Sequence, residues 1–127
     1  LTLPNGAPML YPDLEYFREW NEPENRGEEY WRYRSRKGWV KIYGAKLVEN
    51  LIQGLARVDM SQTLLRIRAL GLPAKLVNLE HDAAAYVVLD KDVELVKAAL
   101  AEEFRRPPSW LPDLPLDCEV FVGETYG

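Results

Sequence analysis

The sequence predicts an α+β fold in which an antiparallel sheet carries helices packed on one of its faces. Three observations support this class. Short runs of aromatic and β-branched residues, typical of strands, cluster before residue 44. A stretch over 44–70 has no proline and repeats apolar residues at helical spacing. Two later apolar runs are separated only by His81-Asp82, as in a tight hairpin.

Residues 1–43 are expected to be rich in strands. Leu1–Leu3 and Met9–Tyr11 flank Asn5-Gly6, which is a strong hairpin signal because both residues tolerate positive φ. Leu14–Trp20 can continue the sheet.

The segment 21–28 is polar and contains proline and glycine, so it predicts a loop. After it, Tyr30–Arg34 and Trp39–Tyr43 are rich in aromatic residues and lie on either side of Lys37-Gly38. This pattern predicts a second hairpin.

One long helix is expected over 44–70. It would end at Gly71 and Pro73, which stop helices. Its apolar stripe comprises Leu47, Val48, Leu51, Ile52, Leu55 and Ala56.

A hairpin over 75–89 follows, and Asp90 is expected to cap a helix over 91–104. The remainder, 105–127, is rich in proline and is expected to be extended, with a closing strand at Cys118–Val122. Together these elements predict a single domain over 1–127.

Composition limits the classes of function. The 127 residues are 47% hydrophobic, which excludes a fully disordered chain, and no apolar run suits a membrane span. Cys118 is the single cysteine and can form no disulfide within the chain, so we expect a cytoplasmic protein. Because the sequence begins with Leu1 rather than Met, we expect a piece of something larger.

The net charge of −4 argues against a free-standing nucleic-acid binder, but the charge is uneven. A basic stretch without an internal acid is interleaved with aromatic residues. It could be an ordinary solvated strand pair or a track for a nucleic-acid backbone. Its cations are Arg32, Arg34, Arg36, Lys37, Lys41 and Lys46.

Two constellations could carry chemistry. Asp82 lies in a tight turn beside the single histidine, His81, where a carboxylate could bind a cation or could simply be a favoured turn residue. On the long helix, Glu49, Gln53 and Arg57 form a polar row at a spacing of four. That row is either a solvated face or a set of contacts to DNA acceptors and phosphates.

Four segments together resemble the C-terminal part of the palm of family A DNA polymerases, above all the phage branch. Lys41–Arg57 is similar to the segment after the fingers, where a Tyr-Gly-Gly-Lys-Leu-Val-Glu-Asn run opens a long helix. Asn78–Val88 resembles motif C, a hairpin whose tip reads His-Asp-Glu. Pro107–Gly127 and Leu1–Tyr11 resemble the C-terminal tail and the strand that leads in.

The resemblance implies a template-directed DNA polymerase that binds primer-template DNA and a dNTP and uses Mg²⁺ ions. Those ions activate the primer 3′-hydroxyl and stabilise the displacement at the α-phosphate. Asp82 matches the metal-binding aspartate, and His81 matches the residue beside the primer terminus. Gln53 matches a glutamine that contacts the minor groove, and Arg57 is expected along the same side.

Departures from the family pattern limit this expectation. The motif A aspartate and motif B are expected upstream of Leu1, in the remainder of the polymerase, so the chain alone should not polymerise. Ala83 occupies the position of the motif C glutamate, and Glu80 could compensate for it. A rival interpretation is therefore a decayed, non-catalytic palm that binds DNA or a partner protein. Apolar surface left uncovered also predicts self-association into a homo-oligomer.

A further departure lies in the helix, where Arg57 is followed by Val58-Asp59 instead of Asp-Val. At about 100° per residue, Asp59 points along the apolar stripe and Val58 moves to its edge. A buried, unpaired carboxylate is costly. We therefore expect a shift of the helix, a pair between Asp59 and Arg66, or a packing different from that of an intact palm.

Overall fold

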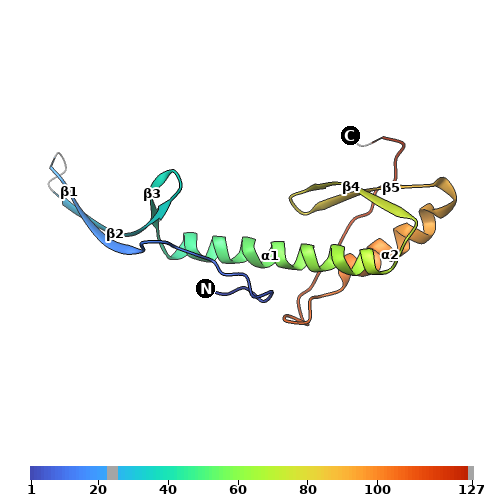
Figure 1. The fold of residues 1–127 in the computed structure, drawn as a ribbon, viewed down its shortest axis with the longest axis horizontal. Coiled ribbons are helices and arrows are strands. Elements are labelled where there is room, and N and C mark those ends of the chain that lie inside the picture. Colours follow the sequence, from blue (N-terminus) through green and yellow to red (C-terminus); the bar gives the residue numbers. More distant parts are fainter. Residues whose placement is uncertain (23–25, 126–127) are drawn as a thin grey trace. The chain divides into compact units, whose positions relative to one another are not determined.

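The computed structural model describes residues 1–22 and 26–125 (Figure 1). Within them the order is three strands, a long helix, two strands, a 3-10 turn and a second helix. The predicted α+β class is confirmed. The strands form two antiparallel sheets, one of three strands and one of two.

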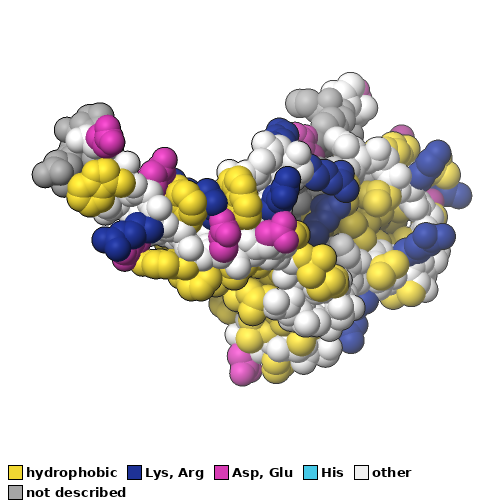
Figure 2. Space-filling view, turned by 60° about the vertical axis from the view of Figure 1, so that its left-hand side comes forward, with side chains coloured by type: hydrophobic (Ala, Val, Ile, Leu, Met, Phe, Trp, Pro, Cys, Tyr) yellow, Lys and Arg dark blue, Asp and Glu magenta, His cyan; other side chains and the backbone are white. Residues whose placement is uncertain are grey.

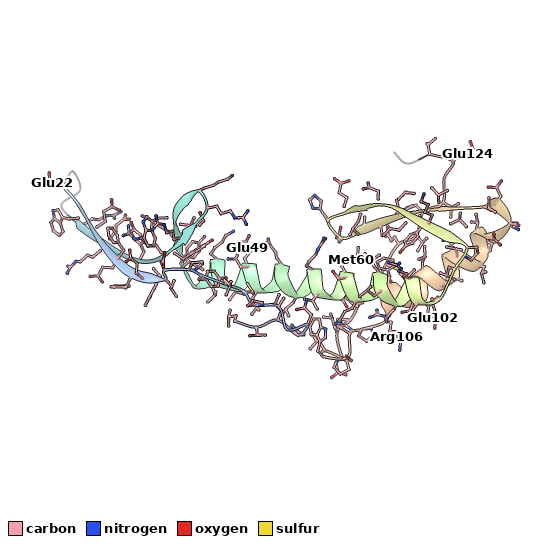
Figure 3. All side chains as sticks on the ribbon, in the orientation of Figure 1. Glu22, Glu49, Met60, Glu102, Arg106 and Glu124 are labelled. Atoms are coloured by element: carbon pink, nitrogen blue, oxygen red, sulfur yellow. The ribbon has the colours of Figure 1, made fainter. Side chains whose placement is uncertain are left out.

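The chain divides into two compact units, Leu1–Ala56 and Arg57–Gly127, each of which is described by itself. Helix α1, Gly44–Ala69, contributes residues to both units. Figure 3 labels Glu49 on its part in the first unit and Met60 on its part in the second. The single domain expected over 1–127 stays a prediction.

The three-stranded sheet of the first unit has the order β1 (Glu15–Asn21), β2 (Arg26–Ser35) and β3 (Gly38–Ile42). The predicted second hairpin is confirmed, because β2 and β3 pair from Trp31 opposite Ile42 to the turn. The loop predicted over 21–28 is shorter than expected, since β2 already begins at Arg26; residues 23–25 of that prediction lie outside the described residues.

On one face of this sheet, cationic side chains lie against aromatic rings. The Arg32 guanidinium lies 3.3 Å from the centre of the Phe17 ring and 4.4 Å from that of Trp39. The ammonium of Lys41 lies 3.9 Å from the centre of the Tyr30 ring. Figure 2 shows hydrophobic side chains beside basic and acidic ones over this sheet. Such contacts stabilise a sheet without burying it fully.

Residues 1–14 pack on the first half of α1 and on β2. Their predicted hairpin is reduced to one bridge, Thr2 opposite Pro8. The methyl groups of Leu3 lie 3.2 and 3.3 Å from the position of a Cβ added to Gly54, so the helix needs a glycine there for close approach. The Asn50 amide also donates to the Tyr11 hydroxyl at 3.3 Å.

Helix α1 confirms the long helix predicted over 44–70. It ends at Ala69, and two residues later Gly71 has a φ of +62°, which suits glycine, and donates its N–H to the Arg68 carbonyl at 3.2 Å. Two expectations about its faces are wrong. Val48 and Ile52, on the predicted apolar stripe, are 53% and 59% exposed, whereas Val58, predicted at the edge, is buried.

The second unit has a small hydrophobic core beneath a hairpin. Strands β4 (Ala74–Glu80) and β5 (Ala83–Val88) confirm the hairpin predicted over 75–89. Helix α2, Val93–Arg105, supplies two of the three residues at the centre of the core. These are Ile67, Val96 and Leu100, surrounded by Leu72, Ala74, Tyr86, Val88 and Phe104.

The cap expected at Asp90 is wrong. Asp90–Asp92 forms a 3-10 turn, in which the Asp92 N–H donates to the Leu89 carbonyl at 2.8 Å. The α-helix therefore starts at Val93, two residues later than predicted, and no side chain caps it.

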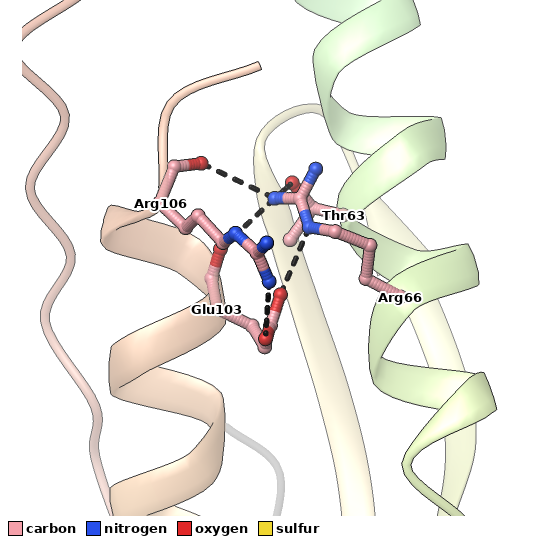
Figure 4. Close-up of polar contacts among 4 residues, drawn as sticks. All are labelled: Thr63, Arg66, Glu103 and Arg106. Carbon is pink, nitrogen blue, oxygen red and sulfur yellow. Dashed lines mark hydrogen bonds and ion pairs between the residues drawn. The ribbon is translucent and has the colours of Figure 1, made fainter. Parts of the chain in front are cut away.

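A buried ion pair joins α1 to α2 (Figure 4). The Arg66 Nε lies 2.8 Å from Glu103 Oε2, and Glu103 is buried. The Nη2 of Arg66 also donates to the Thr63 hydroxyl at 2.9 Å and to the carbonyls of Glu103 and Arg106 at 3.1 and 3.2 Å. Arg66 thus binds two carbonyls at the C-terminal end of α2, of which that of Glu103 also accepts from the Arg106 N–H at 3.3 Å.

The closing strand predicted at Cys118–Val122 is wrong, because these residues form no strand. Side chains hold the extended tail instead. The Trp110 indole donates to Gln62 at 3.0 Å, and Arg105 donates to the Asp117 carboxylate at 2.8 Å and to the Cys118 carbonyl at 3.0 Å. No helix in the described part of the chain is long and apolar enough to cross a membrane.

Candidate functional site

The tip of the β4–β5 hairpin holds the predicted His81-Asp82 pair. Glu80 and Ala83 are the last paired residues, so His81 and Asp82 form a two-residue loop. His81 has a φ of +51°, and Asp82 has no positive φ. This sign pattern is that of a type II′ turn, whose first central position favours glycine. His81 therefore occupies a backbone conformation that its side chain disfavours.

A β-bulge in β4 sets the direction of the tip. Leu76 pairs with Tyr86, but Asn78 pairs with Ala85, so Val77 is the extra residue. Because neighbouring residues of β5 point to opposite faces, Asn78 lies on the face opposite Tyr86, which packs against the core. Glu80 shares that outer face.

Register also places Glu80 directly opposite Ala83. The two residues lie on one face, where Cβ atoms of antiparallel strands are about 5 Å apart. The Glu80 carboxylate thus stands next to Ala83. The alternation expected for Glu80 and Asp82 on a regular strand does not apply, because Asp82 lies in the loop.

The tip is polar and open to solvent. Glu80, His81, Asp82 and Ala83 are all exposed. Within residues 1–22 and 26–125, no side chain forms an ion pair or hydrogen bond with the Asp82 carboxylate. Its oxygens are therefore available to an external ligand.

The described residues do not build a metal site by themselves. Among them, no three His, Cys, Asp or Glu side chains are close enough together to hold an ion. Mg²⁺ prefers six oxygen ligands and takes one or two carboxylates together with water and phosphate oxygens. Asp82 and Glu80 offer carboxylates of the right chemistry, but the other ligands would have to come from outside these residues.

Gln53 is exposed on α1, with its amide donating to Glu49 Oε1 at 3.3 Å. The same oxygen also lies 2.9 Å from the ammonium of Lys46. Exposed contacts of this kind contribute little free energy. Gln53 can exchange this partner for an acceptor on a ligand at small cost.

Arg57 is exposed as well. No acidic side chain among the described residues pairs with its guanidinium, and its carbonyl accepts a hydrogen bond from the Ser61 hydroxyl at 2.8 Å. A free, exposed guanidinium suits a phosphate contact. The roles inferred for His81, Asp82, Gln53 and Arg57 stay predictions.

Asp59 is the one side chain with a buried, unpartnered oxygen in the described part of the chain, at Oδ1. Burial raises the pKa of this carboxyl, and attraction to Arg66 only partly offsets the effect. The pair considered between Asp59 and Arg66 does not form, because Arg66 is held by Glu103. The helix continues through Asp59 without a break, and a shift of the helix relative to an intact palm stays a prediction.

The basic stretch divides into paired and unpaired cations, which its sequence alone does not reveal. Acids from outside the stretch neutralise three of its members: Arg32 pairs with Glu15, Lys41 with Glu28 and Lys46 with Glu49. Sequence analysis missed this division because two of the neutralising acids, Glu15 and Glu28, lie on neighbouring strands. The spacing of three between Lys46 and Glu49 on the predicted helix was the available signal.

Comparison with known proteins gives one relative. The chain is similar to a protein named "DNA polymerase" from Bacillus phage SP02, with 34% identity over 138 aligned positions that include 99% of this chain. The chain spans 19% of the length of that protein. No protein-family model and no solved structure matches the chain.

Proposed function

We propose that this chain is part of the palm of a family A DNA polymerase, which carries out template-directed transfer of nucleotides to a primer. The observation that carries the proposal is the similarity of almost the whole chain to a phage protein named DNA polymerase. The exposed His81-Asp82 loop supports it, since motif C requires a carboxylate at a rigid hairpin tip.

In this proposal the hairpin is the part that contributes to chemistry. Asp82 supplies one carboxylate ligand to Mg²⁺, which would promote attack by the primer 3′-hydroxyl. His81 lies beside the primer terminus, held by the turn. Gln53 and Arg57 contact the DNA minor groove and backbone. Motifs A and B come from the remainder of the polymerase, so the chain alone is not expected to extend a primer.

The test is a graft into the phage relative. The 127 residues replace the matched segment of the Bacillus phage SP02 protein, and primer extension is measured with Mg²⁺ and dNTPs. We expect extension by the graft and none by the chain alone. Asp82→Ala should abolish extension, whereas Asp113→Ala, which removes an exposed carboxylate from the tail, should leave it intact. An inactive graft that is folded and soluble would refute the proposal.

A second candidate is a non-catalytic palm that binds DNA or a protein partner. Ala83, in place of the motif C glutamate, favours it. Glu80 opposes it, because the register puts this carboxylate opposite Ala83. In the graft, Glu80→Gln should lower extension if Glu80 compensates. Extension only after Ala83→Glu would instead favour the decayed palm.

A further inference from the structure

We propose that the tip of the β2–β3 hairpin binds the phosphate backbone of DNA through Arg34, Arg36 and Lys37, here called the cationic tip. The choice of DNA as the polyanion rests on the proposed polymerase function. The surface itself is separate from the β4–β5 hairpin and does not involve Asp82.

The backbone of the cationic tip is fixed before any ligand binds. Ser35 and Gly38 form the last pair of the ladder, so Arg36-Lys37 is a two-residue loop. The Ser35 hydroxyl donates to the Gly38 carbonyl at 2.8 Å and accepts from the Lys37 N–H at 3.2 Å. Gly38 has a φ of +123°, which favours glycine. A preorganised loop loses less conformational entropy on binding.

The charges of the cationic tip are not neutralised. Arg34, Arg36 and Lys37 are exposed, and none has an ion pair with an acid among the described residues. The neighbouring cations Arg32, Lys41 and Lys46 all have acidic partners. In a chain with a net charge of −4, this is a local positive surface rather than a general excess of base.

The side chains suit phosphates. Guanidinium groups form two parallel hydrogen bonds to phosphate oxygens, and lysine acts as a point charge. Arg34 lies opposite Trp39, which is 45% exposed and adds apolar surface at the same end of β3. A projecting loop with unpaired cations fits an extended backbone better than a small anion, which needs an enclosing pocket.

The test measures the anisotropy of a labelled primer-template duplex with the full chain and EDTA, over a range of salt concentrations. Arg34→Gln, Arg36→Gln and Lys37→Gln are combined in one variant. The matched control combines Arg18→Gln, Lys41→Gln and Lys46→Gln, which remove the same charge from cations that have acidic partners. Circular dichroism verifies that both variants fold.

We expect the tip variant to bind about tenfold more weakly or worse at low salt, and to lower the salt slope by about 3, since each duplex phosphate contact contributes about 0.9. The control should lose less than about threefold. A third variant, with Arg34→Lys, Arg36→Lys and Lys37→Arg, keeps the charge and should retain most of the binding.

Three results would overturn the proposal: no DNA binding by the unsubstituted chain, equal losses in tip variant and control, or binding to anionic vesicles in preference to DNA. An inactive graft together with a selective loss in the tip variant would refute the polymerase but keep the DNA contact. An active graft together with equal losses of DNA binding in the tip variant and the control would support the polymerase and refute the DNA contact at the cationic tip.

Discussion

The two units are stabilised by different interactions. In the first unit, Ile42 is the one buried hydrophobic residue among those described, and its sheet relies on exposed ion pairs and cation–aromatic contacts. The second unit has a core centred on Ile67, Val96 and Leu100 and a buried ion pair. A three-stranded sheet with little burial is marginally stable. The second unit can therefore hold its hairpin rigid, whereas the sheet of the first unit depends on contacts between side chains at its surface.

The largest effect should come from truncating the core of the second unit. Ile67→Ala should cost about 2–5 kcal/mol, because it leaves a cavity in packed surroundings. The matched change Ile42→Ala should cost less, since Ile42 lies outside the buried cluster and is slightly more exposed. Urea unfolding gives the free energies, and amide exchange in peptides of each unit shows where the loss occurs. Equal costs would refute the comparison.

The next effect concerns the buried ion pair. Arg66→Met should cost about 3 kcal/mol, because Glu103 would remain buried with only the long Arg106 contact at 3.4 Å. Arg105→Met removes the exposed pair with Asp117 and should cost less than about 1 kcal/mol. Thermal unfolding of both variants at one pH provides the measurement. A larger loss for Arg105→Met would show that the tail, and not the ion pair, anchors α2.

A smaller effect is expected in the sheet of the first unit. Arg32→Gln removes an ion pair with Glu15 and two ring contacts from a side chain that is 19% exposed, so it should cost about 1–2 kcal/mol. Arg18→Gln, in an exposed pair with Glu29, should be nearly neutral. Amide exchange in β1 and β2 is the appropriate probe. Indistinguishable exchange in the two variants would mean that the ring contacts contribute little.

The smallest effect depends on pH. Because burial raises the pKa of Asp59 above its ordinary value of 3.8, the folded state binds the proton more tightly than the unfolded state. The ionised carboxylate therefore destabilises the fold at neutral pH, and this penalty is relieved as the pH falls through the raised pKa.

Asp59→Asn should consequently stabilise the chain at pH 7 by less than about 1 kcal/mol, since the group is partly exposed and screened. The gain should disappear in acid. Melting curves across this pH range test the prediction, with Asp113→Asn in the exposed tail as control. A gain that did not change with pH would refute the link to ionisation.

Local signals predicted the elements well where the determining interactions are local. The two-residue turns, the helix over 44–70 and its stop at Gly71 follow from backbone preferences of nearby residues. The strand predicted at Cys118–Val122 failed because a strand needs a partner edge, which local sequence does not specify. The buried face of α1 was wrong because different segments cover the helix along its length, so Val58 rather than Val48 is enclosed.

The candidate site likewise combines features that local sequence predicts with features that depend on pairing between strands. The turn signal located His81-Asp82 at a hairpin tip, because the connection leaves no other residues for the loop. It did not reveal that Glu80 stands opposite Ala83, since that depends on the pairing of β4 with β5. It also did not separate Arg34 from Arg32, because the partner of Arg32 is Glu15 on another strand.

The extra residue Val77 has a consequence for comparing sequences across relatives. Deleting it would let β4 pair regularly with β5 and would leave Asn78 opposite Ala85 and Glu80 opposite Ala83, on the face away from Tyr86. A relative with one residue fewer here would keep both its His-Asp loop and the preceding carboxylate on the same side of the hairpin. An alignment that places the missing residue at Val77 therefore compares Glu80 with the residue that precedes the loop in such a relative.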